Sequence, residues 1–347
     1  MIALRDLQWR RRRFLIAVLA TSLVFALTLL LSGAGNGLRQ EASRIVGSFG
    51  SDAWFVPEGA SGPFTASSAL PESTAAQVAA LDGVERADPF VFARYAVGED
   101  APEDVNVLGH RVGGIGSPEP DEGRAAEGPG EAVVDSVLGI DVGDTIELGD
   151  RPFEVVGRTG GVSFNFGVPT VFVPLEDVQA LAFGGQPLAT SVVSRGTPAA
   201  APAGLVMLNN DEVVADMRRP MKSGLQTIDF INALLWVIAA GIIGSIVYLS
   251  AIERTRDFAV LKATGGSNAP LMVGLALQAV VLSVASAAAA MVLARPLMAG
   301  FPFDILIPTS AYVVLPLVAV AVGLLASLAG LRRAVRVDPA LAFGGGG

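Results

Sequence analysis

Cysteine is absent from this 347-residue chain. The absence excludes disulfide bonds, thiolate metal sites and a cysteine nucleophile. Any globular part must therefore be stabilised by a buried core of its own, and a part of roughly 190 residues is large enough to form one.

Histidine occurs once, as His110 in the segment VLGHRVGG. A zinc site needs several nitrogen or sulfur ligands, so one histidine without cysteine does not supply it. A Ser-His-Asp arrangement would have to use His110, and the sequence contains no G-x-S-x-G elbow. We therefore interpret His110 as a surface or loop residue of a globular domain.

Lysine occurs only as Lys222 and Lys262, and neither follows a glycine. The phosphate-binding loop G-x-x-x-x-G-K-[ST] is therefore missing, and the chain cannot be a P-loop ATPase by itself. The glycines at 113, 114 and 116 open no strand-to-helix nucleotide fold, and we expect a loop there. The sequence thus predicts a chain that is not an enzyme and holds no cofactor of its own.

Charged residues make up 16% of the chain, against about 25% in a typical soluble domain. The deficit is concentrated in four uncharged runs, at residues 14–38, 230–252, 263–294 and 305–331. A helix needs about 20 apolar residues to cross a bilayer, and each run is long enough. The alternative, buried helices of a large soluble protein, is disfavoured because core helices are usually shorter and have a polar face. We expect transmembrane helices at 14–34, 228–252, 270–294 and 309–331.

The remaining long segment has the opposite character. Residues 35–225 carry 27 Asp and Glu against 12 Lys and Arg, a net charge of −15, whereas the rest of the chain has a net charge of +6. An acidic surface does not suit nucleic acid, so no nucleic-acid partner is expected. The predicted fold is an α-helical membrane protein with four transmembrane helices plus an α+β extracytoplasmic domain, residues 35–227, inserted between helices 1 and 2.

Short basic segments predict the orientation, because they stay on the cytoplasmic side. Such segments occur at 1–13, 253–267 and 332–347. We therefore expect both termini in the cytoplasm of a bacterial cell, a multi-pass protein of its cell membrane, and an outer loop at 295–308. Arg218, Arg219 and Lys222 lie on the outer side, but long translocated segments largely escape this rule.

The segment RRRRFL at residues 10–15 is similar to a twin-arginine export signal. Two interpretations are open, a cleaved signal peptide and an uncleaved first span. The second is favoured because no convincing A-x-A site follows and three further apolar runs lie downstream.

Within the acidic domain, several segments rich in Val, Ile, Phe and Thr predict strands. Residues 145–148 and 153–156 flank Gly149-Asp150-Arg151-Pro152 and predict a hairpin. Helices are expected at 74–81, after a Ser/Thr cap, and at 175–182. Residues 197–204, TPAAAPAG, are interpreted as a short linker.

A charged segment, Ile252 to Ser267, separates the second and third apolar runs. We expect a short helix from Glu253 that ends at the glycine pair beginning with Gly265, with Phe258 and Leu261 on one face. Two interpretations are open, a connector on the membrane surface and a docking helix for a cytoplasmic partner.

The same segment resembles the MacB/FtsX-type permeases of ABC transporters. That family has a first span, a large extracytoplasmic domain, three closing spans, and between spans two and three a pattern similar to E-R-x-x-E-[IF]-x-x-[LM]-[KR]-A-x-G. This chain reads ERTRDFAVLKATG at 253–265, with Asp257 for the usual Glu and Phe258-Ala259 where Ile-Gly is common. Similar to the family as well are the amino-terminal ALRDLQWRRRR, the internal EAVVDSVLGIDVGDTIELGDRPFEVVGR and the final RRAVRVDPALAF.

The resemblance implies a permease subunit that pairs with a separate cytoplasmic ABC ATPase, which binds ATP and Mg. It also implies a second permease copy, a membrane-lipid environment, and ATP-driven motion of the extracytoplasmic domain that serves export or extraction of an envelope substrate. The ATPase-docking residues carried over from the motif are Glu253, Arg254, Arg256, Asp257, Phe258, Leu261, Lys262 and Gly265. Two alternatives are an FtsX-like regulator of a cell-wall hydrolase and a membrane sensor or scaffold without an ATPase.

Overall fold

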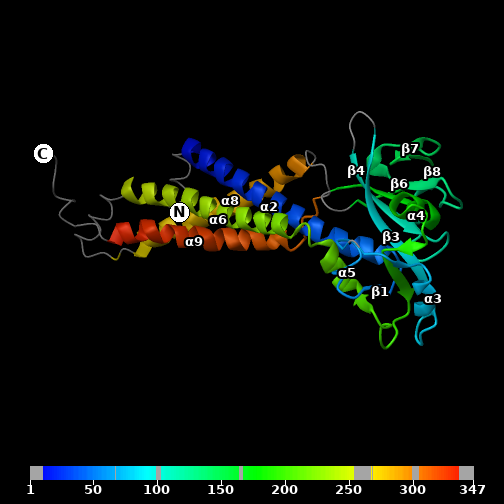
Figure 1. Cartoon of the computed structure of the whole chain (residues 1–347). Coiled ribbons are helices and arrows are strands. Elements are labelled where there is room, and N and C mark those ends of the chain that lie inside the picture. The colour runs from blue at the N-terminus through cyan, green and yellow to red at the C-terminus, as the bar shows by residue number, and fades with distance from the viewer. Residues whose placement is uncertain are drawn as a thin grey trace. The chain divides into compact units, whose positions relative to one another are not determined.

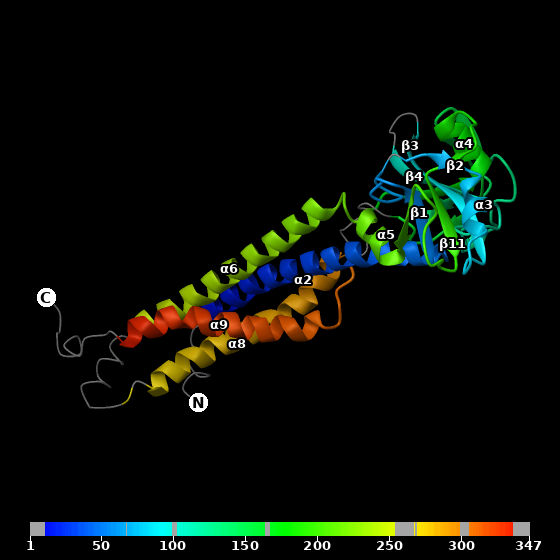
Figure 2. The ribbon, with the colours of Figure 1, turned by 60° about the horizontal axis from the view of Figure 1, so that its bottom comes forward.

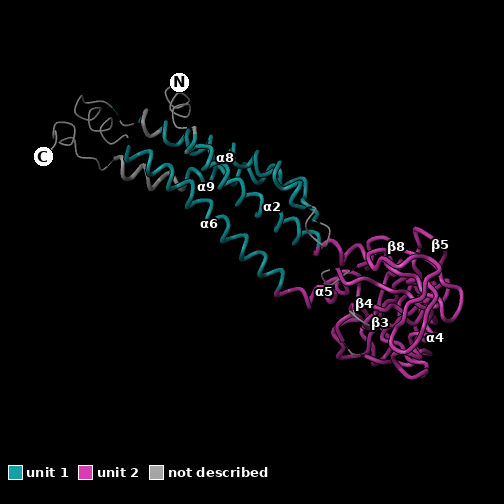
Figure 3. The backbone as a smooth tube through the Cα atoms, turned by 90° about the horizontal axis from the view of Figure 1, so that it is seen from above, with its two compact units in different colours: residues 1–37, 224–347 teal, residues 38–223 magenta. Residues whose placement is uncertain are grey.

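The computed structural model describes residues 11–66, 68–98, 103–163, 167–253, 267, 269–298 and 305–335. The chain divides into two compact units, coloured separately in Figure 3. A helical unit comprises residues 1–37 and 224–347, and an inserted domain comprises residues 38–223. The division lies within a few residues of the 35–227 expected from charge.

Four long helices form the helical unit and lie alongside one another in Figures 1 and 2. They are α2 (Arg11–Ser48, of which residues 38–48 belong to the inserted domain), α6 (Lys222–Glu253), α8 (Ala269–Met298) and α9 (Ala311–Val335). Within the described part of the chain, three stretches are long and apolar enough to span a membrane: Phe14–Ser48, Lys222–Glu253 and Val273–Met298. In α9, the apolar stretch found among the described residues is the shorter Ala311–Leu325.

Small side chains fill the interface between these helices. The buried cluster contains Ala26 of α2, Ala239 and Ala251 of α6, and many alanines of α8 such as Ala287. Alanine at these positions lets helix backbones approach closely, which is how helices associate in lipid. Large apolar side chains, among them Leu19 and Val292, point outward and are exposed, as lipid-facing residues are.

The inserted domain is built on one mixed sheet of ten strands, in the order β12-β1-β11-β3-β4-β9-β6-β8-β5, with β7 paired to β8. The pairs β4–β9 and β6–β8 are parallel and the others are antiparallel. The elements are β1 (Ala53–Pro57), β2 (Leu70–Pro71), α3 (Thr74–Ala79), β3 (Arg86–Val97), β4 (Glu103–His110), β5 (Glu122–Gly123), β6 (Glu131–Asp135), η1 (Ser136–Leu138), β7 (Thr145–Leu148), β8 (Arg151–Thr159), β9 (Thr170–Pro174), α4 (Leu175–Phe183), β10 (Leu188–Ala189), β11 (Ser191–Arg195), β12 (Leu205–Asn209) and α5 (Asn210–Met217).

Helices cover both faces of this sheet. Alternate residues of β4 separate the two cores: Val105 and Val107 belong to one cluster and Leu108 to the other, as expected for a strand buried on both sides. The first cluster includes α3 and α4. The second includes α5, the end of α2 and an aromatic group of Phe49, Trp54, Phe64 and Phe90, with ring centroids 5.2–6.3 Å apart. The α+β class predicted from sequence is confirmed.

Several local predictions are confirmed and two need correction. The hairpin exists, but β8 begins at Arg151, so the turn contracts to Gly149-Asp150, with φ of 64° at Gly149. Helix α3 has Ser73 at its N-cap, yet this side chain makes no capping hydrogen bond. Residues 197–204 lie between β11 and β12, neighbours of β1 in the same sheet, so the expected short linker is a loop that connects two strands of the domain.

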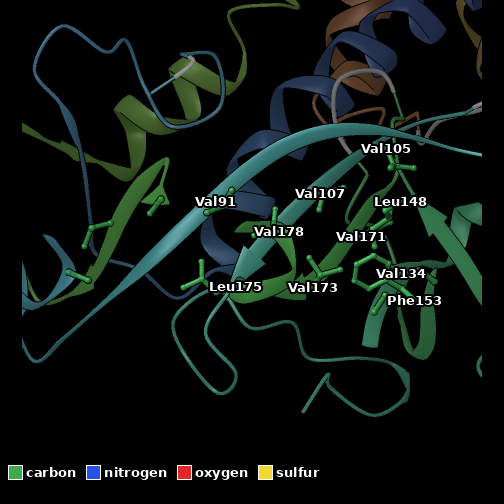
Figure 4. Packing of buried hydrophobic residues seen from close by; sticks show 14 of the residues in the cluster. Val91, Val105, Val107, Val134, Leu148, Phe153, Val171, Val173, Leu175 and Val178 are labelled. Carbon is green, nitrogen blue, oxygen red and sulfur yellow. The ribbon is translucent and has the colours of Figure 1, made fainter. Parts of the chain in front are cut away.

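Gly109 shows how tightly α4 packs on the sheet. A Cβ at this position in β4 would lie 1.9 Å from Cγ1 of Val178, which Figure 4 shows beside Val91 and Val107. We expect Gly109→Ala to destabilise the inserted domain by about 1–2 kcal/mol, because α4 must shift. The midpoint of thermal unfolding of the full-length protein, followed by its tryptophan fluorescence, to which the buried Trp54 contributes, measures this.

Gly47→Ala is the matched control, because Gly47 lies in α2 with nothing within 4 Å of its added Cβ. Glycine inside a helix costs about 0.5–1 kcal/mol relative to alanine, so this variant is expected to be neutral or slightly more stable. Equal losses for the two variants would contradict the steric argument at Gly109.

Candidate docking site and cleft

The sequence-predicted docking residues fall almost wholly outside the described part of the chain. Glu253 is the last residue of α6 and is exposed. The other seven, Arg254, Arg256, Asp257, Phe258, Leu261, Lys262 and Gly265, lie outside the described residues. Their roles therefore stay predictions from the sequence motif.

A side-chain hydrogen bond links the helices on either side of this segment. The Gln278 side-chain amide of α8 donates to the Ser250 hydroxyl of α6 at 2.9 Å. At the start of α8, the Ala269 amide donates to the Ser267 hydroxyl at 3.1 Å.

Polar side chains also link the opposite region of the helical unit. The side-chain amide of Asn232 in α6 donates to the Ser32 hydroxyl of α2 at 3.2 Å. The side-chain amide of Asn36 donates to the Leu306 backbone carbonyl at 2.9 Å. A Cβ at Gly33 would lie 2.6 Å from Cγ2 of Ile305, so glycine is required for this close contact. Helices α2 and α6 and the segment before α9 are therefore connected by hydrogen bonds as well as by packing.

His110 is buried, so its interpretation as a surface or loop residue is wrong. It is the last residue of β4 and is 1% exposed. Its Nδ1 lies 3.0 Å from both the Arg111 carbonyl oxygen and the Ser117 hydroxyl, and no partner for Nε2 lies among the described residues. Burial lowers the pKa of His110, opposed by the Arg111 carbonyl and the charge of Asp88. An imidazole enclosed in this way is closed to a substrate.

Two carboxyl groups of the inserted domain have strongly different surroundings. The Arg124 guanidinium, with the Glu127 and Gly128 amides, lowers the pKa of Glu131 to about 2. Burial raises the pKa of Asp135. Among the described residues, no three His, Asp or Glu side chains are grouped as a metal site requires. The charges here stabilise turns and strand ends.

A cleft of about 530 Å³ lies within the inserted domain, and sequence patterns gave no sign of it. It is lined by parts of the segment before β2, by the middle of β3, and by the end of α4, including Phe64, Phe92, Arg94, Phe183 and Thr190. Phe64 and Phe92 contact edge to face at 5.2 Å, and the Arg94 guanidinium lies 5.9 Å from the Phe92 ring centroid. These residues are far apart in sequence, which is why only the fold reveals them together.

Comparison with known proteins covers nearly the whole chain. The family model described as MacB-like periplasmic core domain matches residues 14–218, and the model described as FtsX-like permease C-terminal matches residues 230–339. ABC transporter permeases of Mycobacterium tuberculosis and Mycobacterium bovis are 43% identical over 344 residues, 99% of each chain.

Solved structures give weaker matches. The periplasmic region of MacB from Actinobacillus actinomycetemcomitans is 11% identical, covering 50% of this chain and 95% of that one, with a TM-score of 0.35. The extracellular domain of the noncanonic ABC-type transporter YknZ from Gram-positive bacteria is 14% identical, covering 43% and 84%, with a TM-score of 0.33. The family assignment rests on the family models and on the mycobacterial relatives. By these, the chain belongs to the MacB/FtsX-type ABC transporter permeases, membrane subunits that are not themselves the ATPase and that work with a partner ATPase.

Proposed function

We propose that this permease converts ATP hydrolysis by a separate ATPase subunit, which binds the ATP and Mg, into motion of the inserted domain outside the cytoplasm. The motion serves export or extraction of an envelope substrate. The observation that carries the proposal is the 253–265 motif, placed between two apolar helices in a chain that has no phosphate-binding loop. A second permease copy completes the complex.

The helix α2 supports this mechanism. It runs without a break from Arg11 to Ser48, through the residue where the helical unit gives way to the inserted domain. Its last turns contribute Ala42, Ile45 and Val46 to a core of that domain. A single helix therefore contributes residues to both units, and we propose that it carries the motion from one to the other.

We further propose four spans with both termini in the cytoplasm, α9 being the fourth. Single cysteines introduced by Gly47→Cys, Ser267→Cys and Gly345→Cys test this, because the chain has no native cysteine to react. A membrane-impermeant thiol reagent is expected to label only the first variant in intact cells. External labelling at 267 would contradict the orientation, and labelling at 345 would contradict the fourth span.

The motion itself is tested with a spin label at Val137→Cys, a position 57% exposed in the inserted domain. In the reconstituted complex, the distance between labels on two permease copies is expected to change by about 5 Å or more when a non-hydrolysable ATP analogue is added. The same label in the Phe258→Ala, Leu261→Ala background is the control and should not respond. An unchanged distance in the intact complex would contradict the proposed transmission, whereas the absence of any inter-copy distance would contradict the second copy.

A further inference from the structure

Strand β3 extends beyond its neighbour. It has 12 residues, but β11 pairs only with residues 86–90, and no other described strand pairs with the rest of the β11-side edge of β3. Thr190, just before β11, closes the start of this edge: its amide donates to the Phe90 carbonyl at 3.0 Å, and its hydroxyl accepts from the Phe92 amide at 3.0 Å. Among the described residues, the open edge therefore begins after Phe92.

The backbone of Arg94 faces this open edge. Arg94 is paired with Asn106 of β4, and the Asn106 amide donates to the Pro169 carbonyl on the far side of β4. In an antiparallel pair, both backbone groups of a residue point the same way, so Arg94 and Asn106 form a non-hydrogen-bonded pair. The N–H and C=O of Arg94 consequently point away from β4, and no hydrogen bond to either is found among the described residues.

The cleft lies along this edge and has side chains on both faces of the sheet. Phe92 and Arg94 lie on one face together with Phe64, whereas Ala93 and Phe183 lie on the other. Successive side chains of an added strand point alternately to the two faces, so each set finds a surface to contact. Among the described residues that line the cleft, Arg94 alone carries a charge.

We propose that the open edge of β3, from Ala93 to Ala96, binds an extended peptide segment of a partner protein as an additional strand. Backbone hydrogen bonds to Arg94 give the affinity, and an apolar side chain packs against the Phe92 and Phe64 rings. One carboxylate of the peptide pairs with Arg94. The net charge of −15 over residues 35–225 disfavours a strongly acidic partner, so the segment is apolar with a single acidic residue. This interaction is independent of ATPase docking, and either can fail alone.

Full-length permease in nanodiscs is titrated with fluorescent, end-blocked pentapeptides of Thr and Val that carry one Glu at position 2, 3 or 4. We expect one register to bind, and Arg94→Ala to weaken it about five- to tenfold through loss of the ion pair. Arg94→Pro removes the N–H as well and is expected to weaken it about fivefold further. Proline at this position costs no bond to β4, because that N–H points to the edge, where proline is tolerated.

The matched control is the same peptide with N-methyl groups at alternate residues, which keeps the side chains but blocks the backbone bonds. Two such peptides are possible, with N-methyl groups at the odd or at the even positions. The one whose methyl groups replace the N–H groups that face β3 is expected to lose binding, and the other to retain it. This control keeps the test decisive even if Arg94→Pro fails to fold.

Three results would overturn the proposal. The first is no binding by any peptide up to about 1 mM. The second is equal binding of both N-methylated forms. The third is Arg94-dependent binding of a fluorescent fatty acid that no peptide displaces, which would make the cleft a site for amphiphiles.

Discussion

Truncating Phe258 and Leu261 to alanine together is expected to separate the permease from its ATPase while leaving the permease in the membrane. The two residues are three apart and share a face of the predicted helix, and they are the largest apolar side chains in an otherwise charged segment. Buried apolar anchors dominate such interfaces, each costing roughly 2 kcal/mol or more on truncation. We expect the affinity to fall by about a hundredfold or more, measured by co-purification after mild solubilisation.

The matched control is Arg254→Ala with Arg256→Ala, which removes two charges from the same segment. Rim charges mainly affect association rate and salt dependence, so this variant should keep its ATPase at low salt. A competing explanation is that Phe258 and Leu261 lie in the lipid headgroups, in which case the ATPase co-purifies in full yield. Retention by the apolar variant and loss by the arginine variant would reverse the assignment.

The membrane helices could be predicted because their signal is local. Each uncharged run is a property of about 20 consecutive residues, and α6 and α8 appear where those runs lie. The end of the first helix could not be found this way. Charge and glycine at 35–39 suggest a boundary, yet α2 continues to Ser48 because Ala42 and Ile45 recur at helical spacing and are buried in the inserted domain.

The inserted domain could be predicted from the sequence only in part. Individual strands and the hairpin of β7 and β8 follow from β-branched residues and turn chemistry, which are local. The strand order, with β1 between β12 and β11, depends on pairings of residues more than 130 positions apart, such as Phe55 with Val192. No periodicity in the sequence encodes that pairing. The cleft beside β3 is a product of this order and could not be predicted either.

His110 illustrates the same point at a single residue. The preceding Val107 and Leu108 favour a strand, but the following RVGG suggests a loop, and histidine type alone does not decide burial. Burial results from tertiary contacts: the ring lies 6.3 Å from that of Phe172 in β9 and bonds to Ser117 in the next turn. The consequence is a group whose protonation matters for stability.

Acidification is expected to destabilise the inserted domain through His110. The folded domain keeps this imidazole neutral, because burial lowers its pKa below the ordinary value of 6.5. The unfolded chain therefore binds more protons as pH falls below 6.5, and stability falls with it, until the pH reaches the folded-state pKa. Each pH unit in this window removes at most about 1.4 kcal/mol, or roughly 2–5 °C of the unfolding midpoint. Above pH 6.5 His110 contributes no pH dependence.

The variant His110→Gln isolates this effect, because glutamine keeps polar atoms near Ser117 and Arg111 but does not titrate. Asp135 acts in the opposite direction, because its raised pKa makes the folded state bind a proton more tightly than the unfolded state. Both proteins contain Asp135, so its contribution cancels when their midpoints are compared. The Glu131 contribution is lost only between its ordinary range and about pH 2, outside the window. We expect the unfolding midpoint of the wild type to fall relative to that of His110→Gln as the pH is lowered from 7 to 5. Tryptophan fluorescence of the full-length protein follows both midpoints. If the two midpoints differ by the same amount at every pH in that range, the pKa of His110 is the same in the folded and the unfolded state, and the prediction is wrong.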